Sequence, residues 1–520
     1  MKITFYLAWG LVLVLCLSGC SPEKTTVEKP TPEKPDRNMF GNYLPRGLTK
    51  TSENLAPGYI KFNGANSSYV YLANREGQIV HQWRGQYAVL NSYLLDDGSV
   101  LMEEWDPDYP TFLGDGAYGR LQKVDWEGKI LWDFELATRQ NIIHHDVAVL
   151  PNGNILAITY DVISFDEAVA HGRKPELTPK FNGGFMEKII ELEPVGKYDA
   201  KIVWEWQLKD HLVQNFDASK ANYGNPAEHP ELLDFNVGDS LAPAITQDSL
   251  DARIAEGKGH RNQTVDSFGS DFYHFNAINY NPDLDQIVVS SPHLDEVFII
   301  DHSTTIKEAA SHKGGRWGRG GDFLYRWGNP ENYMQGDSTD QMLFGQHDVR
   351  WIPKELPGGG HLTVFNNNVP MGPDSLNYSA VYEIDPPMDD SGNYVLSQNG
   401  RFGPESPSWV YVAPDTISFY SSFISSAHRM ANGHTLIDEG AKARFFEVTP
   451  DGEILWEYLN PFRGEIREPN GDPANMGMPY SNFRVTFIPA DHAAFAGREL
   501  KPLDPQPKAF TLPPKEEKKS

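Results

Sequence analysis

Cysteine is nearly absent from this sequence: the 520 residues include only two, at positions 16 and 20. The chain after residue 20 therefore contains no thiol. A disulfide, a cysteine nucleophile and a zinc site with thiolate ligands are excluded from that part of the chain. It must be held together by its core, and a chain of this length can bury a large one.

Positive charge is also scarce. Lys and Arg number 45 against 71 Asp and Glu, which gives a formal net charge of −26 at pH 7. Such an acidic surface repels phosphate backbones and anionic lipid headgroups, so we expect no nucleic-acid partner. An anionic substrate would need local positive charge to overcome this background.

The N-terminal apolar run, in "MKITFYLAWGLVLVLCLSGC", is short. It follows an early lysine and is too short for a comfortable membrane span, so residues 1–20 are predicted to be a signal peptide. The residues "LSGC" resemble the lipobox of bacterial lipoproteins, which implies that Cys20 becomes the lipidated first residue of the mature protein. Ser21 is not the aspartate that often signals inner-membrane retention. We therefore expect an outer-membrane lipoprotein, facing the periplasm or the outside; a simple secreted protein is the alternative.

Polar segments flank the rest of the chain. Residues 21–40 are rich in Pro, Glu, Lys and Thr, and they have too few apolar groups to fold. We expect a flexible tether there and a polar tail over residues 506–520. Between them, residues 41–505 are predicted to form one large domain.

Two strand patterns alternate along this domain. The first has alternating apolar residues followed by a turn, and it occurs at 91–102, 145–156, 274–289, 347–365, 425–437 and 483–491. The second has a turn followed by a strand that is mostly rich in Trp, and it occurs at 77–83, 128–134, 200–206, 322–327, 407–412 and 453–458. Period-two alternation with Asn-Gly, Asp-Gly and Pro-Asp turns predicts antiparallel hairpins.

This repetition predicts an all-β fold, namely a six-bladed β-propeller. The series begins with an unpaired second pattern at 77–83 and ends with an unpaired first pattern at 483–491, so both chain termini are expected to close one blade. A sandwich or a solenoid has no reason to split a repeat in this way; an irregular all-β protein with chance hairpins is the alternative. The partly helical insertion at 207–272 is expected to form a lid over one mouth of the propeller.

Three histidines share one register of the first pattern. His145, His274 and His347 begin it in three consecutive blades. Because this pattern forms the innermost strand of a blade, their side chains should converge near the axis. Each alone could be structural, but three in register predict a shared chemical role. Asn276 should point the same way by strand periodicity, whereas His428 should face the other side of its strand and pack.

Three converging histidines permit two kinds of chemistry. They could bind a metal such as Zn or Cu through neutral imidazoles. Alternatively, one could be a nucleophile while the others supply protons and stabilise developing negative charge. The spacing does not choose between them.

Several of these phrases resemble the bacterial arylsulfotransferases: "HHDVAVLPNGNIL", "HFNAINYNPDLDQIVVSS", "GQHDVRWIP" and "SSFISSAHRMANGHTLIDEGAKARFFEVTPDGEILWEYLNP". The resemblance covers about residues 57–490. It implies a six-bladed propeller that moves a sulfuryl group from a phenolic sulfate to a phenol acceptor, by a ping-pong mechanism through a sulfated histidine. Neither a nucleotide donor nor any other cofactor is expected.

The resemblance also implies residue roles. His347 in "GQHD" matches the nucleophile, His145 and His274 match assisting histidines, and Asn276 matches a polar neighbour in an H-x-N motif. In such chemistry a neutral imidazole attacks sulfur in line with the leaving phenolate. Hydrogen-bond donors surround the equatorial oxygens, and an acid protonates the leaving group.

The sequence lacks one positively charged residue of the family pattern. Where the family often has "SSR", with an Arg that contacts the sulfuryl oxygens, this chain has "SSPH", which places Pro292 and His293 there. We expect His293 or Arg350 to bind the sulfuryl group instead, although a protonated histidine is a weaker and pH-dependent replacement.

Two other functions stay open at this point. One is a lipoprotein propeller that binds an aromatic or sulfated ligand without catalysis, marked by the lost Arg. The other is a metal-dependent hydrolase or oxidase that uses the three histidines as ligands. The sequence identifies neither the physiological donor and acceptor nor the oligomeric state.

Overall fold

The computed structural model describes residues 40–64, 67–105, 116–179, 183–237, 246–255, 265, 269–372, 376–463 and 479–512. The predicted signal peptide with Cys20 lies outside these residues, and so does the predicted tether except for its last residue. Within them, no helix is long and apolar enough to cross a membrane.

Three sheets have four antiparallel strands each. In order of pairing these are β11 (Asp199–Gln207), β10 (Gly184–Val195), β9 (Ile155–Ile163) and β8 (Asn141–Val149); β14 (Ala277–Asn281), β15 (Gln286–Ser291), β16 (Glu296–Asp301) and β17 (Phe323–Trp327); and β18 (His347–Trp351), β19 (Leu362–Pro370), β20 (Asn377–Ile384) and β21 (Trp409–Tyr411). In each sheet the first sequence pattern forms one edge strand and the second pattern forms the other.

A five-stranded sheet and a seven-stranded sheet complete the series. Their strands, again in order of pairing, are β1 (Gly47–Lys50), β25 (Ile454–Leu459), β24 (Arg444–Val448), β23 (Thr435–Glu439) and β22 (Ser426–Arg429); and β26 (Val485–Pro489), β2 (Gly58–Phe62), β3 (Ser67–Ala73), β4 (Ile79–Leu94), β5 (Val100–Trp105), β6 (Gly119–Val124) and β7 (Ile130–Glu135). The prediction of an all-β fold is confirmed.

Strand β4 is 16 residues long and belongs to two parts of the seven-stranded sheet. Residues 79–84 pair with β3, and residues 88–94 pair with β5; Val89 pairs with both, since it also lies opposite Ser67 of β3. At one edge of this sheet, β26 pairs with β2 over five residue pairs, from Gly58 opposite Pro489 to Phe62 opposite Val485. The strands predicted at 77–83 and 483–491 therefore lie in one sheet.

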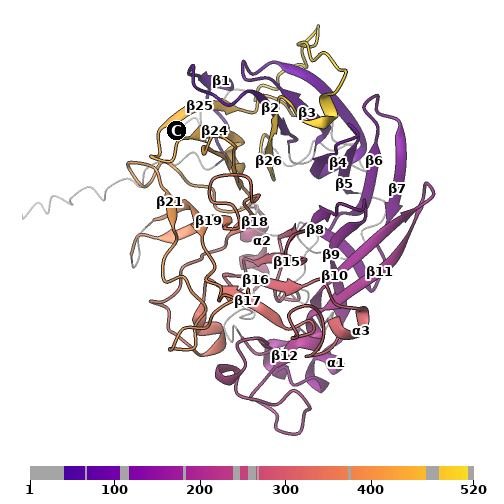
Figure 1. Ribbon diagram of the computed structural model, residues 1–520, viewed down its shortest axis with the longest axis vertical. Coiled ribbons are helices and arrows are strands. Elements are labelled where there is room, and N and C mark those ends of the chain that lie inside the picture. The colour runs from indigo at the N-terminus through magenta and orange to yellow at the C-terminus, as the bar shows by residue number, and fades with distance from the viewer. Residues whose placement is uncertain are drawn as a thin grey trace, which may run out of the picture. The chain divides into compact units, whose positions relative to one another are not determined.

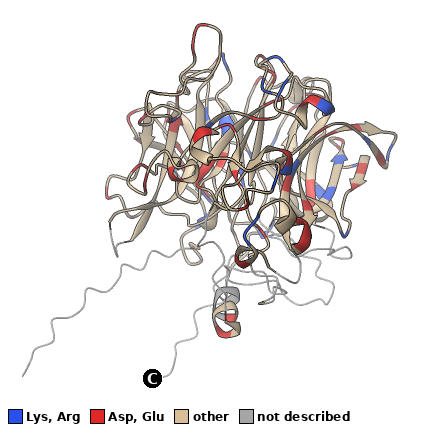
Figure 2. Ribbon diagram, turned by 90° about the horizontal axis from the view of Figure 1, so that it is seen from below, with Lys and Arg blue, Asp and Glu red and all other residues tan. Residues whose placement is uncertain are grey.

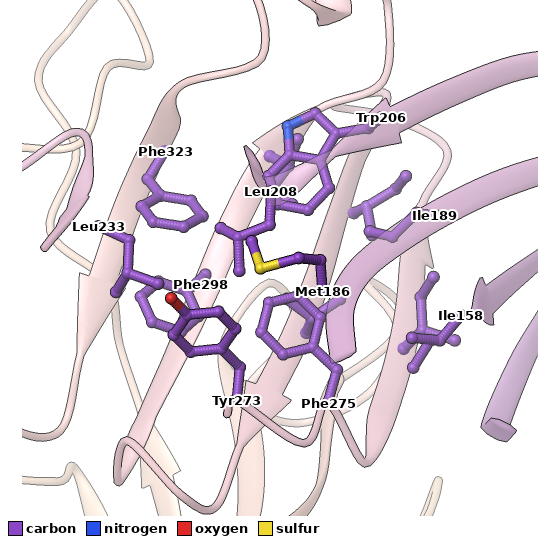
Figure 3. Close-up of a cluster of buried hydrophobic side chains, with 14 of the residues drawn as sticks. Ile158, Met186, Ile189, Trp206, Leu208, Leu233, Tyr273, Phe275, Phe298 and Phe323 are labelled. Atoms are coloured by element: carbon purple, nitrogen blue, oxygen red, sulfur yellow. The ribbon is translucent and has the colours of Figure 1, made fainter. Parts of the chain in front are cut away.

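The sheets follow one another around a ring in a propeller-like arrangement (Figure 1). Aromatic and aliphatic side chains fill the space between neighbouring sheets. Figure 3 shows one such cluster, in which Met186 and Trp206 of the β8–β11 sheet meet Phe298 and Phe323 of the β14–β17 sheet. The rings of Phe298 and Phe323 lie 4.4 Å apart between centroids. Burial of each such side chain contributes about 1.5–3 kcal/mol, so these contacts hold adjacent sheets together.

The helical elements are short. They are α1 (Phe165–Ala170), α2 (Gln247–Ala255), α3 (Ile306–Ala309) and the 3-10 turns η1 (Pro175–Leu177), η2 (Leu208–His211), η3 (Pro226–Glu228), η4 (Pro330–Tyr333), η5 (Gly440–Lys442) and η6 (Ala493–Phe495). Two further strands, β12 (Leu212–Val213) and β13 (Leu233–Asp234), form a small parallel sheet inside the insertion.

The lid prediction is wrong for residues 208–237 of the insertion. Leu208 and Leu233 belong to the hydrophobic cluster between the two sheets (Figure 3). The Phe323 N–H of the edge strand β17 donates to the Glu231 carbonyl. This part is held beside edge strands because its apolar side chains extend the core between the sheets.

Helix α2 takes a different position. It projects onto the middle of the ring in Figure 1, and Figure 2 draws it beyond the sheets at one end. A lid role therefore stays a prediction for α2 alone. Residues 238–245 and 256–264, which flank it, lie outside the described residues.

Part of the predicted C-terminal tail packs on the domain. The Gln506 side chain accepts a hydrogen bond from the Ile79 N–H at 2.7 Å and donates one to the Ile79 carbonyl at 2.9 Å. The Phe510 ring lies 5.7 Å from that of Tyr480. The packed part of the chain thus continues past residue 505, to Leu512, which joins the same core cluster.

A buried arginine lies among the innermost strands. Arg484, 3% exposed, places Nη1 2.6 Å from Asp146 and Nε 2.7 Å from Asp348. Each carboxylate also accepts a backbone N–H from the following sheet: Asp146 from Ile278 at 2.9 Å, and Asp348 from Ala427 at 3.1 Å. One cation and two anions therefore connect the start of β26, which Arg484 immediately precedes, to four other innermost strands: β8, β14, β18 and β22.

Replacing Arg484 with methionine tests how much these ion pairs contribute to the stability of the protein. The variant leaves Asp146 and Asp348 buried without their shared cation, so we expect the free energy of unfolding to fall by about 3–5 kcal/mol. Urea denaturation measures the change. The control, Arg319→Met, alters an exposed arginine and should change stability by less than about 0.5 kcal/mol. If the two substitutions lowered the free energy of unfolding equally, the Arg484 ion pairs would not contribute specially to stability.

Candidate active site

Two of the three register histidines have an unusual backbone conformation. His145 and His274 have φ angles of +58° and +55°, in the left-handed region that costs a non-glycine residue about 1–3 kcal/mol. The His145 N–H donates to the Gly116 carbonyl at 2.8 Å. A Cβ atom at Gly116 would lie 2.3 Å from the His145 ring, so only glycine permits this approach. The third blade differs, because its positive φ falls on Asp348, the residue after His347.

The rings of His145 and His274 meet edge to face, 4.3 Å apart between centroids. His145 Nδ1 also lies 2.8 Å from His144 Nδ1, and His144 in turn contacts Glu187 through Nε2 at 3.1 Å. The His144 ring stacks on Tyr160 at 3.5 Å. These contacts fix the position of the buried His145 ring from two sides.

His274 has an acidic partner. Its Nδ1 lies 2.5 Å from Asp271 Oδ2, and the Tyr160 hydroxyl donates to the same carboxylate oxygen at 3.0 Å. The His293 ring stacks on the His274 ring, with centroids 4.7 Å apart. Burial acts to raise the pKa of Asp271, but the nearby histidines, His274 first, hold it below its usual range. An ionised Asp271 in turn favours a proton on His274.

Among the described residues, the hydrogen bonds of the His347 ring are made by Nδ1. This atom lies 2.9 Å from Asn367 Oδ1 and 3.1 Å from the Gly345 carbonyl, which are both acceptors. The Asn367 Nδ2 donates to the carbonyls of Ser421 and Ile424, which assigns its Oδ1 to the histidine. The hydrogen of a neutral His347 therefore lies on Nδ1, and Nε2 carries the free lone pair.

Electrostatics keep His347 and His145 neutral. Burial lowers the pKa of His347 to about 4, and the nearby His274 adds to this effect, while the contacts with Asn367 and Gly345 oppose it. Burial, followed by the neighbouring histidines His274, His144 and His347, lowers the pKa of His145 well below its usual value. At neutral pH both imidazoles are uncharged, which is the form that can attack an electrophile.

The other three residues that the sequence predicted for the site lie in three different places. Asn276 is buried, and its Nδ2 donates to the Gln346 carbonyl beside His347 at 2.8 Å. His293 is exposed next to His274. Arg350 is elsewhere: it pairs with Asp348 at 2.8 Å and lines a separate cavity of about 540 Å³ that none of the three register histidines borders.

His428 was expected to pack, but it joins the charged network. Its Nε2 lies 3.0 Å from Asp348 Oδ2, and its side chain lines the same cavity as Arg350. The sequence pattern also missed Asn367, Asp271 and Tyr160. Asp271 lies three residues before His274, a signal that could have been noticed, whereas Asn367 and Tyr160 lie on the second strands of their sheets, where the pattern marked only a hairpin.

Among its described residues, the site has one group of atoms suited to a metal. The donor atoms of Asp271, His274 and His293 all lie within 4.8 Å of one another. This set overlaps the three register histidines only at His274. It therefore keeps metal chemistry open, with ligands that differ from those expected from the sequence.

An Asn367→Asp substitution should change the protonation of His347. A carboxylate facing Nδ1 favours the imidazolium, so we expect the pKa of His347 to rise from about 4. Titration of the imidazole resonances by NMR measures it. The control, Asn368→Asp, changes a neighbour whose amide contacts Ser422 and Tyr420 instead, and should leave the pKa of His347 unchanged. If the pKa of His347 were unchanged in the Asn367→Asp variant, the contact between His347 Nδ1 and the side chain of residue 367 would be contradicted.

Most of the chain is similar to several solved structures at low sequence identity. With solved structures the identity is 10% to a protein of unknown function from Bacteroides caccae, with 83% of this chain and 99% of that chain covered and a TM-score of 0.41. It is also 10% to the periplasmic gluconolactonase of Pseudomonas aeruginosa, with coverage of 83% and 99% and a TM-score of 0.38. For the Cps50 (Swd1) β-propeller domain of Myceliophteria thermophila the identity is 10%, the coverage 81% and 92%, and the TM-score 0.36.

The comparison with curated proteins found no match. A family model, described as Arylsulfotransferase (ASST), matches residues 48–458, which is most of the sequence. The chain therefore belongs to the arylsulfotransferase (ASST) family.

Proposed function

We propose that this protein transfers a sulfuryl group from a phenolic sulfate ester to a phenol by a ping-pong mechanism, with His347 as the nucleophile and without a nucleotide. The observation that carries the proposal is the state of His347: its Nδ1 is committed to two acceptors, its pKa is lowered to about 4, and its Nε2 holds a free lone pair. Membership of the arylsulfotransferase family supports the reaction class.

The first half-reaction forms one bond and breaks one. His347 Nε2 attacks sulfur as the bond between sulfur and the phenolic oxygen breaks, which leaves a sulfated histidine and a phenolate. The phenolate then takes a proton. His274 is suited to supply it, because the Asp271 carboxylate at 2.5 Å stabilises its protonated ring. His145, neutral and 4.3 Å from His274 between ring centroids, can stabilise the equatorial oxygens by hydrogen bonding.

The second half-reaction is the reverse with another phenol. His274, having lost its proton, accepts one from the incoming hydroxyl, whose oxygen attacks sulfur and releases His347. Asn276 serves the same centre through the backbone that precedes His347, where it holds the Gln346 carbonyl. His293, stacked on His274, is the group closest to the missing family Arg in the sequence and is proposed to bind the sulfuryl group.

We extend the proposal to the whole architecture. Six blades result when the seven-stranded sheet is divided within β4, and the blade that contains β26 and β2 then joins the two ends of the domain. The pairing of β26 with β2 and the two pairing partners of β4 support this division. A lipid on Cys20 would attach the protein to the outer membrane, as the "LSGC" motif indicates.

Replacement of His347 with alanine should abolish transfer, because no sulfated intermediate can form. His145→Ala and His274→Ala should retain transfer reduced by ~10²–10⁴-fold, since these residues assist without carrying the group. A chromogenic aryl sulfate with a phenol acceptor gives the rate, and mass spectrometry identifies the modified residue. His171→Ala, at an exposed helix end, is the control for histidine loss.

Wild-type transfer by the His347 variant would disprove the nucleophile assignment. If the wild-type protein never transfers sulfate, the alternative of a ligand-binding protein without catalysis takes its place. Loss of transfer on treatment with EDTA, with recovery on addition of Zn²⁺ and a bound ion that the His274→Ala variant loses, would instead favour a metal held by Asp271, His274 and His293.

A Pro292→Arg substitution tests the missing charge. If the family arginine position faces the donor, the new guanidinium should lower the KM for the aryl sulfate by pairing with the sulfuryl oxygens. Pro292→Ala is the matched control, because it removes the proline without adding charge. Equal KM values for the two variants would show that position 292 does not face the donor.

A further inference from the structure

A second histidine cluster lies away from the candidate active site, where the insertion meets the β14–β17 sheet. His211 Nδ1 lies 2.8 Å from Asp322 Oδ1, and His312 Nδ1 lies 2.7 Å from the same oxygen. His211 ends η2 and is fully buried, whereas Asp322 immediately precedes β17 and His312 follows α3. Two imidazole nitrogens from distant segments thus share one carboxylate oxygen.

The tautomer of His211 is fixed by its other nitrogen. His211 Nε2 lies 2.8 Å from the Ala309 carbonyl, which can only accept, so the hydrogen lies on Nε2. In a neutral ring Nδ1 then has no hydrogen, and its lone pair faces the carboxylate at 2.8 Å. This contact is repulsive unless a positive charge lies between the two atoms, either a second proton on the ring or a metal ion.

The groups around His211 resemble those around a histidine that binds a metal. A histidine that binds a metal usually donates its other N–H to a carbonyl or a carboxylate, as His211 does to Ala309. The Trp206 ring stacks on His211 with an angle of 1° between the planes, and its Nε1 donates to the Gly321 carbonyl. A Cβ atom on Gly321 would lie 2.1 Å from the Ala309 carbonyl oxygen. Glycine at this position therefore leaves room for the hydrogen bond between His211 and the Ala309 carbonyl.

The cluster is reachable from solvent. His312 and Asp322 line a cavity of about 720 Å³, which His229 and Glu231 also border. The side chain of His312 is 59% exposed. The three donor atoms lie within 4.8 Å of one another. A tetrahedral zinc site with bonds of roughly 2.0–2.1 Å would separate its donors by roughly 3.3 Å. The contacts of Asp322 with His211 and with His312, now 2.8 Å and 2.7 Å, would therefore each widen slightly on binding.

We propose that His211, His312 and Asp322 bind Zn²⁺ or another divalent ion that prefers imidazole, with the open position of the ion facing the cavity. Two imidazoles and one carboxylate select such ions over Ca²⁺ and Mg²⁺, which prefer oxygen ligands. The ion joins η2, at the start of the insertion, to the segment between α3 and β17. It therefore stabilises the contact between the β8–β11 and β14–β17 sheets.

Zn²⁺ binding to the full chain, after removal of metals with EDTA, tests the proposal. Competition with a chromophoric chelator should show one ion that the His312→Ala variant loses or binds at least about 10-fold more weakly. Zn²⁺ should also raise the unfolding temperature of the wild-type protein more than that of the variant, because it binds the folded state. His171→Ala, which alters another histidine of the same cavity, is the matched control and should bind like the wild type.

Two further variants separate this site from other histidines. Asp322→Asn should lose the same ion as His312→Ala, whereas His274→Ala, in the candidate active site, should keep it. Zn²⁺ binding that is identical in the wild type and in the folded His312→Ala variant would overturn the proposal. So would absence of Zn²⁺ binding by the wild type.

Discussion

The ion pairs of Arg484 with Asp146 and Asp348 are the contact on which the centre of the molecule depends. Burial acts to raise the pKa of Asp348, but the guanidinium groups of Arg350 and Arg484 hold it below its usual range, so the carboxylate stays charged. Each aspartate directly follows a histidine of the candidate site, His145 or His347. In both His-Asp pairs the aspartate therefore fixes the strand to the centre and to the next sheet, while the histidine beside it belongs to the candidate site.

Much of this architecture could be predicted from the sequence, because alternation and turns are local signals. The strands at 77–83 and 483–491 lie in one sheet as expected, and His145 and His274 are in contact. The central arginine could not be predicted, because Arg484 occurs in a repeat whose register position holds Phe483 and its partners are far away in the chain. Nor could the continuity of β4 through the seven-stranded sheet, since the sequence does not show whether residues 85–87 end the strand.

Side-chain direction limits the prediction of the site more than strand position does. Arg350 was expected near the sulfuryl group because it follows His347 closely, yet the pairing with Asp348 directs it to another cavity. Asn367 was missed because hairpin patterns do not reveal which polar side chain of a second strand faces the neighbouring histidine. The insertion was taken for a lid because of its length, but Leu208 and Leu233 bury apolar surface between two sheets.

The pairing of β26 with β2 has a consequence for biosynthesis. A ribosome makes β2 early and β26 more than four hundred residues later, by the numbering of the two strands. Until then, the edge of β2 has no native partner, and an open edge can pair with other chains. The nascent protein therefore depends on holding its first strands apart from neighbouring chains until β26 has been made. Truncation shortly before residue 485 would leave that edge permanently open.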